Sequence, residues 1–336
     1  MVRWGHINNK LITNINIEGL LDYSKINMLS IVIPLYNKSR SIVNTINSVL
    51  NQSYQDFEIV VVDDGSTDGS AEAVRAIEDN RIRLIQKENG GVCSARNAGI
   101  TNARYDYIAL LDADDVWDKD YLLEQKRMIE DFPEAALWGI NFAELYDGQL
   151  MRELETGLPK GFRGIVEDYF GLPTKKGRVS DLFCSSSVVI RKEAFAKAGL
   201  FDERIKYSED IDMWYRIIAN YPVAFYDRYM AFYLYDAENR AMNRERPLKY
   251  WLPYFVDKYS EYKGNEPFYT FIQRWCAVKI KECYFKQKSQ RKDAKVASAR
   301  LDYSVLPAKY KYLFHTPYPI GKIIYWLGEA KLALLK

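Results

Sequence analysis

Three carboxylates within four positions end a short apolar run of this chain. The run is Tyr107–Leu111, and Asp112, Asp114 and Asp115 follow it directly. An apolar segment of this length, bounded by turn residues, is typical of a buried strand in a parallel sheet. Because like charges repel, a fold keeps such acids together when a cation offsets them, and Mg²⁺ or Mn²⁺ bound through oxygen suits that need. A polar turn after a strand explains the same residues, since Asp is common in turns.

A second group of acids, Glu209 and Asp210, begins a helical pattern. Ser208 precedes them as the expected N-cap, and the apolar stripe that follows consists of Ile211, Trp214, Tyr215 and Ile218. A carboxylate at this place can act as a general base whose pKa its neighbour adjusts. Ordinary acidic charge favoured by the helix dipole is the alternative.

Apolar strands and helical patterns alternate around these acids. Strands are expected at Leu29–Leu35, Phe57–Val62, Arg81–Gln86, Tyr107–Leu111 and Ser185–Ile190. Three helices are expected between them: the first has Ile42, Val43, Ile46, Val49 and Leu50 on one face, the second lies near Ser70–Glu78 and the third near Ser94–Asn102. This alternation predicts an α/β fold with a mostly parallel sheet flanked by helices. Ligands of such sheets bind outside the carboxyl ends of the strands. We therefore expect Pro34–Asn37, Asp63–Ser66 and Asp112–Asp114 to meet at one edge.

Five segments together resemble the family 2 glycosyltransferases, which have the GT-A fold. The segments are Leu29–Asn37, Val60–Asp68, Asn89–Gly99, Asp112–Asp114 and Glu209–Asp210. They follow the family's order over about residues 28–235, and they are specific as a set although each alone is weak. The resemblance implies an inverting, metal-dependent enzyme that moves one sugar from a nucleotide-sugar, with UDP the favoured nucleotide.

The resemblance also assigns a role to each residue of the nucleotide site. Pro34, Tyr36 and Asp64 would hold the base, because a carboxylate can accept a hydrogen bond from an N–H of the base. Arg96 would reach the base or the diphosphate. Gly90 and Gly91 would let the backbone approach the nucleotide. An Asp–Gly turn explains Asp64 otherwise, and a surface salt bridge explains Arg96 otherwise.

The family's metal and catalytic residues transfer in the same way. Asp114 would bind Mn²⁺ or Mg²⁺, Asp112 would contact the ribose or the metal's water shell, and Asp115 stays open as a further ligand. Asp210 would be the catalytic base that deprotonates the acceptor hydroxyl. Glu209 and Trp214 would lie on the acceptor side.

The last hundred residues differ in charge from the rest. Residues 236–336 carry 20 Lys and Arg against 10 Asp and Glu, whereas the first 235 carry 27 against 35. Within this basic region, positions 320, 323, 324, 327, 330 and 334 fall on one helical face. Such a helix suits an anionic membrane surface, and a helix packed on the body or a homodimer interface are the alternatives. No nucleic-acid-binding module is recognisable, so no nucleic acid is expected as partner.

These patterns predict residues 1–27 as an N-terminal extension, with Met28 as a candidate start, 28–235 as the GT-A domain and 236–336 as a helical appendage. The sequence shows no secretory signal and no apolar run of the roughly 18–20 residues that span a bilayer, and its four cysteines lack metal-type spacing. We therefore expect a cytoplasmic protein that is peripheral on the inner face of the membrane. The expected reaction extends a surface glycan or a polyprenyl-linked acceptor by one sugar. A nucleotidyltransferase and a catalytically silent nucleotide- or glycan-binding module are the alternatives.

Overall fold

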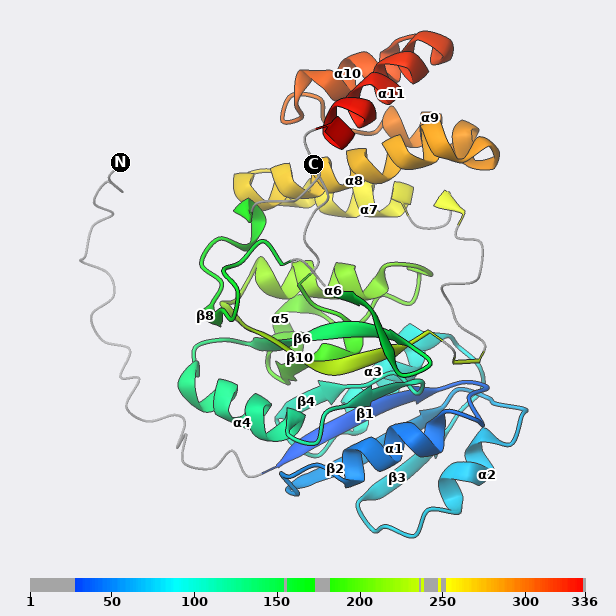
Figure 1. The fold of residues 1–336 in the computed structure, drawn as a ribbon, viewed down its shortest axis with the longest axis vertical. Helices are drawn as coiled ribbons and strands as arrows, with labels where there is room; N and C mark the ends of the chain where they lie inside the picture. The colour runs from blue at the N-terminus through cyan, green and yellow to red at the C-terminus, as the bar shows by residue number, and fades with distance from the viewer. Residues whose placement is uncertain are drawn as a thin grey trace, which may run out of the picture.

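The structure is a computed structural model that describes residues 28–153, 156–172, 182–235, 237, 238, 247, 248 and 252–334 (Figure 1). The expected extension, residues 1–27, lies outside the described residues. In chain order the elements are β1 (Leu29–Leu35), α1 (Ile42–Leu50), β2 (Phe57–Asp63), α2 (Ser70–Arg75), β3 (Ile82–Gln86), α3 (Val92–Asn102), β4 (Tyr107–Leu110), β5 (Asp115–Trp117), α4 (Tyr121–Asp131), β6 (Leu137–Tyr146), β7 (Gln149–Glu153), β8 (Arg163–Ile165), β9 (Val188–Arg191), α5 (Ala194–Ala198), α6 (Glu209–Ile218), β10 (Val223–Leu234), α7 (Leu252–Lys258), α8 (Glu266–Lys286), α9 (Arg291–Ser298), α10 (Ala308–His315) and α11 (Tyr318–Leu334).

One sheet runs through the body of the molecule in the order β3-β2-β1-β4-β9-β6-β10-β5, with β7 paired to β6 and β8 paired to β10. The first four strands pair in parallel, as expected, and β6 also pairs in parallel with β10. The α/β class is therefore confirmed. The sheet is more mixed than the alternation predicts, because β9 runs antiparallel between β4 and β6, and β5 is antiparallel to β10.

Both faces of the parallel half are covered, and for this reason its strands are apolar at successive positions. In β1, Ile31 and Ile33 lie in the apolar cluster that includes Ile46 of α1, while Val32 points to the opposite face and the cluster of α3. A Cβ atom at Gly99 of α3 would lie 2.3 Å from Cγ1 of Val32, so glycine permits the close approach of α3 to β1. The first residues of α3 thereby reach the end of the sheet.

Three details differ from the expected elements. Val43, expected on the buried face of α1, is exposed, and Thr45 is buried instead, where its hydroxyl donates to the Ala113 carbonyl at 3.0 Å. The strand expected from Ser185 begins at Val188, because Ser185–Ser187 form a 3₁₀ turn. The side chain of Ser208 makes no capping hydrogen bond to α6; its backbone is left-handed, with φ 62°.

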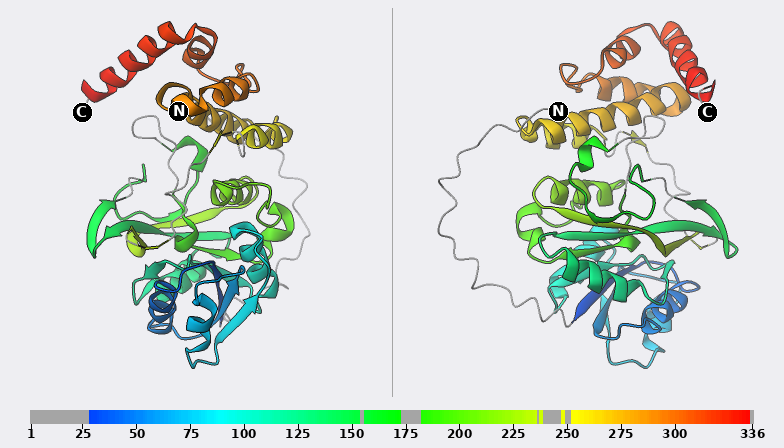
Figure 2. Two further views of the ribbon diagram at one scale, coloured as in Figure 1. Left: turned by 90° about the vertical axis from the view of Figure 1, so that its right-hand side faces the viewer. Right: turned by 60° about the vertical axis from the view of Figure 1, so that its left-hand side comes forward.

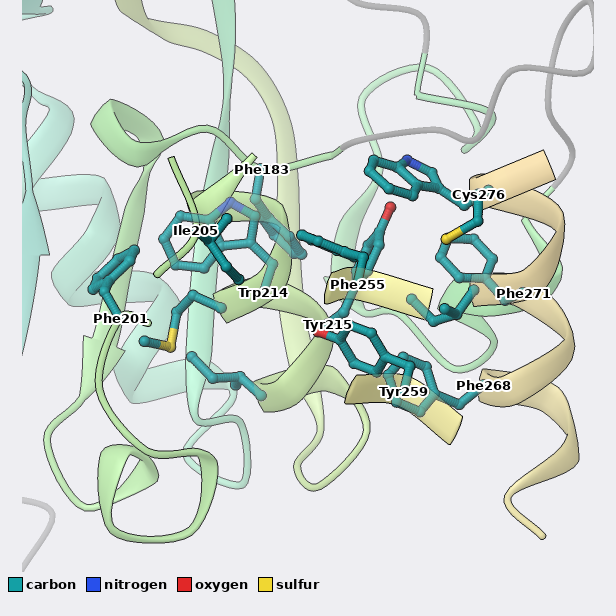
Figure 3. Packing of buried hydrophobic residues seen from close by; sticks show 14 of the residues in the cluster. Phe183, Phe201, Ile205, Trp214, Tyr215, Phe255, Tyr259, Phe268, Phe271 and Cys276 are labelled. Atoms are coloured by element: carbon teal, nitrogen blue, oxygen red, sulfur yellow. The ribbon is translucent and has the colours of Figure 1, made fainter. Parts of the chain in front are cut away.

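Helices α7–α11 form a separate layer beyond α6, seen at the top of Figure 1 and from two further sides in Figure 2. An aromatic cluster joins this layer to α6 (Figure 3), with ring centroids 5.0 Å apart for Tyr215 and Phe271 and 5.2 Å apart for Phe255 and Trp275. Helix α6 is thus packed on two sides. Among the helices of the described part of the chain, none combines the length and apolar character needed to cross a membrane.

Candidate functional site

A cavity of about 640 Å³ lies at the carboxyl ends of the parallel strands. Pro34 near the end of β1, Asp64 after β2 and Asp112 after β4 all line it. The register explains this meeting, because β1 pairs in parallel with both β2 and β4 and the three strands end at the same edge. The predicted convergence of the strand-end segments is confirmed.

The first residues of α3 and α6 complete the cavity. Of the residues predicted as site residues, Pro34, Tyr36, Asp64, Arg96, Asp112, Asp114, Glu209 and Asp210 all line it. Trp214 is not among the lining residues: its side chain is 1% exposed and meets the ring of Phe201 edge-on at 6.2 Å. The structure places Trp214 in the buried apolar stripe predicted for α6, and not in the lining of the cavity.

Arg96 connects the two groups of acids. Its guanidinium donates to Asp112 Oδ1 at 2.7 Å through Nη2 and to Glu209 Oε1 at 3.0 Å through Nη1. The residue is 3% exposed, which excludes the surface salt bridge considered from the sequence. Its Nε–H meets no hydrogen-bond acceptor among the described residues. The end of β4 and the start of α6, about a hundred residues apart in the chain, are thus tied by one side chain.

Asp114 carries an ion pair that the sequence did not reveal. The Lys38 ammonium donates to Asp114 Oδ2 at 2.5 Å and to the carbonyl oxygen of Glu238 at 2.5 Å. Burial raises the pKa of the Asp114 carboxyl, with Lys38 acting against the shift. The available signal was a lysine directly after the polar segment that ends β1. Lys38 therefore brings a positive charge into the lining of the cavity.

Asp115 is turned into the protein beneath these residues. Its Oδ2 accepts a hydrogen bond from Ser186 Oγ at 2.5 Å, and Ser186 Oγ in turn accepts the Asp112 N–H at 3.1 Å. Burial, together with the nearby charge of Asp114, raises the pKa of Asp115 well above its usual range. Asp115 and Ser186 therefore fix the backbone that presents Asp112, and Ser186 is a supporting residue that the sequence did not single out.

The carboxylate of Asp64 is held by three donors. The Lys87 ammonium lies 2.7 Å from Oδ1, the Gly90 N–H donates to Oδ1 at 3.0 Å, and the Gly91 N–H donates to Oδ2 at 2.7 Å. The two glycines thus orient Asp64 as well as lining the cavity. Gly91 has φ 91°, a conformation that a side chain would strain. The turn at Gly90 and Gly91 therefore holds the Asp64 carboxylate in place at the cavity.

Asp210 stands at the cavity in the first turn of α6. Its Oδ1 accepts the Ile211 N–H at 2.8 Å, and the left-handed Ser208 sets the direction in which the turn starts. Glu209 beside it is partly buried, and its burial together with Asp210 raises the pKa of Glu209 although Arg96 opposes the shift. The helix start therefore presents one carboxylate tied to Arg96 and a second that lines the cavity.

The charge of the lining bears on the expected metal. Seven of the lining residues are Asp or Glu and three are Lys or Arg, so the cavity favours cations. No set of three or more His, Cys, Asp or Glu side chains in the described ranges could hold a metal ion by itself. Mg²⁺ and similar ions commonly take one or two carboxylates and complete their shell with substrate phosphates and water. The carboxylates of Asp112 and Asp114 in the lining fit that mode.

Comparison with known proteins places the chain in a family. The family model for glycosyl transferase family 2 matches residues 30–198. An uncharacterized glycosyltransferase of Rickettsia conorii is 32% identical over 208 residues, 60% of this chain and 32% of that protein. The amylovoran biosynthesis glycosyltransferase AmsB of Erwinia amylovora is 31% identical over 198 residues, 56% of this chain and 62% of that protein. The matched part of the chain therefore spans less than two thirds of either relative.

Solved structures show the same fold. The crystal structure of S. aureus TarS 1–349 in complex with UDP-GlcNAc superposes with a TM-score of 0.69 over 88% of each chain, at 17% identity. At that identity the likeness speaks for the fold alone, and it confirms the GT-A architecture with C-terminal helices. The family model covers half of the chain and includes the strand-end residues of the cavity. The chain belongs to glycosyl transferase family 2.

Proposed function

We propose that this chain is an inverting, metal-dependent glycosyltransferase that moves one sugar from a UDP-sugar to a hydroxyl of a glycan or polyprenyl-linked acceptor in surface polysaccharide synthesis. The observation that carries the proposal is the cavity in which Arg96 joins Asp112 to Glu209, with Asp114 and Asp210 in the same lining. The name of AmsB and the UDP-GlcNAc complex of TarS add support for the donor and pathway class. Residues 28–235 would form the catalytic domain and 236–336 its helical appendage.

The donor would occupy the sheet edge. Asp64, held by two backbone N–H groups and Lys87, is oriented to accept an N–H of the uracil base, beside Pro34 and Tyr36. Asp112 would contact the ribose, and the free Nε–H of Arg96 gives the diphosphate or the base a donor in a buried site. Lys38 would leave Asp114 and place its ammonium on the diphosphate. A metal held by Asp114 would supply positive charge for the leaving diphosphate.

Transfer would proceed by a single displacement. Asp210 takes the proton of the acceptor hydroxyl while the hydroxyl oxygen forms a bond to the anomeric carbon. The bond from that carbon to the diphosphate oxygen breaks on the opposite face, and the nucleoside diphosphate leaves with the electron pair. The configuration at the anomeric carbon is inverted as a result. Asp210 stands in the first turn of α6, and Arg96 joins the neighbouring Glu209 to Asp112, which would hold the base in position relative to the donor site.

A panel of nucleotide-sugars with Mn²⁺ tests the proposal. UDP and one or more UDP-sugars should raise the thermal unfolding temperature, and UDP-sugar hydrolysis without acceptor should be measurable. Asp210→Asn should keep UDP binding and lose turnover by roughly 10²–10⁴-fold, the usual contribution of a general base. Asp131→Asn, on the surface-exposed end of α4, is the matched control.

Three outcomes decide the assignment. Unimpaired turnover in Asp210→Asn would remove that residue as the base. UDP binding without turnover of any donor would favour the catalytically silent module. Turnover that survives complete removal of divalent cations would exclude the metal-dependent form of the reaction.

A further inference from the structure

Helix α11 packs on its neighbours through an unusual set of side chains. Tyr325 is buried and stacks on Phe285 of α8, with centroids 4.9 Å apart and ring planes 9° apart. One turn earlier, Gly321 fits against the same ring and the Leu313 carbonyl; a Cβ there would lie 3.2 Å from that oxygen. Aromatic stacking and a close glycine contact therefore attach α11 to α8 and α10.

Four described aliphatic side chains of α11 lie on the opposite side. Ile320, Ile323, Ile324 and Leu327 are spaced at i, i+3, i+4 and i+7, and their exposed fractions are 53%, 61%, 44% and 67%. We call these four residues the outer face of α11. Positions 330 and 334, expected to extend it, have no described side chains. An ordinary surface helix buries such a stripe, and a contiguous exposed one marks an interaction surface.

Charge identifies the partner of the outer face. Residues 274–300, which form most of α8 and all of α9, contain nine Lys and Arg against two acids, and Lys309, Lys311 and Lys322 add charge on α10 and α11. Two copies meeting through this region would bring like charges together. An anionic bilayer would instead attract the basic side chains while it took up the aliphatic ones. Trp326, exposed at the border of the outer face, is a residue type favoured at the headgroup level.

We propose that the outer face of α11, in the basic helical layer formed by α8–α11, is a docking surface for an anionic lipid bilayer. The helix would lie in the plane of the interface with its aliphatic side chains at the headgroup–acyl boundary. Figure 2 shows α11 at the end of the molecule far from α1 and α2, where it can meet a surface without the sheet intervening. This inference goes beyond the proposed reaction, because docking requires neither donor nor acceptor.

Vesicle flotation of the full chain tests the docking surface. We expect it to float with vesicles of phosphatidylcholine and phosphatidylglycerol in equal parts, to remain behind with phosphatidylcholine alone, and to lose binding as salt is added. Ile323→Glu with Leu327→Glu should weaken binding more than about tenfold, because two aliphatic side chains no longer enter the interface. Leu150→Glu with Met151→Glu, on the exposed hairpin strand β7, is the matched control and should float like the parent.

The substituted residues of α11 are exposed, so the thermal unfolding temperature should stay unchanged and a lost interaction would not reflect misfolding. Equal flotation of both double variants would overturn the proposal, and so would failure of the parent to float with anionic vesicles. Sedimentation velocity tests whether a second copy of the chain binds the outer face instead. A concentration-dependent dimer that Ile323→Glu with Leu327→Glu abolishes would assign the outer face to a second copy of the chain.

Discussion

Replacement of Arg96 by Met would test the connection between the two halves of the cavity. Methionine keeps an unbranched stem of similar reach and removes the guanidinium, leaving the carboxylates of Asp112 and Glu209 without their shared partner. The two acids differ in solvent access: the side chain of Asp112 is 31% exposed and that of Glu209 is 15% exposed. Water can therefore compensate much of the charge of Asp112, and most of the penalty falls on Glu209.

The expected loss of stability follows from this difference. Removing one partner of a buried ion pair costs about 3–5 kcal/mol, because a buried charge is left uncompensated. With Asp112 discounted for its exposure, we expect the free energy of unfolding to fall by about 3 kcal/mol near pH 7. Arg75→Met, which breaks an exposed pair with Glu72, should cost less than about 1 kcal/mol and serves as the control.

The loss should depend on pH in a defined direction. Burial and Asp210 already raise the pKa of Glu209, and removal of Arg96 raises it further. A carboxyl with a folded pKa above its unfolded value binds more protons in the native state, so stability falls as pH rises between the two values. The Arg96→Met penalty should therefore be smaller in mild acid than at neutral pH.

Urea unfolding of Arg96→Met, Glu209→Gln and the double variant, at neutral pH and in mild acid, measures these losses in the free energy of unfolding. In the Arg96→Met background, Glu209→Gln should recover most of the lost stability, because a neutral amide needs no counter-charge. The reasoning fails if Arg96→Met unfolds within about 0.5 kcal/mol of the parent at neutral pH. It also fails if Glu209→Gln gives no recovery.

Two further predictions concern the lining of the cavity. Lys38→Met should raise the dissociation constant of UDP with Mn²⁺ by roughly tenfold or more, since a charge-assisted contact to phosphate is worth about 1.5–3 kcal/mol; isothermal titration calorimetry measures it, and an unchanged constant would exclude Lys38 from the donor site. Burial, aided by Glu209, raises the pKa of Cys93 to about 12, so at pH 8 only about one thiol in ten thousand is ionised. Iodoacetamide should therefore modify Cys93 slowly in the native protein and readily in urea, and rapid native labelling seen by mass spectrometry would contradict the burial.

The positions of the strands were predictable from the sequence, and so was the edge of the sheet at which the ligand-binding residues lie. Both depend on local sequence. A strand buried on both faces is an apolar run whatever its neighbours are, and the residues just after it must leave the sheet at its carboxyl edge. Asp64 and Asp112 were placed at one edge by this rule alone. The left-handed Ser208 had no such signal, because a serine before acids is ordinarily read as a side-chain cap.

The remaining features depend on contacts between distant segments. The pair of Lys38 with Asp114 spans 76 positions, and nothing near either residue specifies the other. Strand β9 pairs antiparallel with both β4 and β6, a choice that its four residues do not encode. Trp214 belongs to the apolar stripe predicted on α6, and its packing against Phe201 outside the cavity lining depends on a loop contact that the stripe does not specify.

The shared aromatic cluster between α6 and α8 also constrains how the chain folds during its synthesis. One apolar core includes Val32 and Val60 of the sheet, Tyr215 of α6, and Phe271 and Phe285 of α8. The ribosome completes α6 at Ile218 but reaches the end of α8 only at Lys286, a delay on the order of several seconds at common rates of translation. Until then the outer side of α6 presents apolar rings to solvent, so nascent chains of intermediate length should engage chaperones. The catalytic body and its helical layer should reach their native state as one cooperative unit.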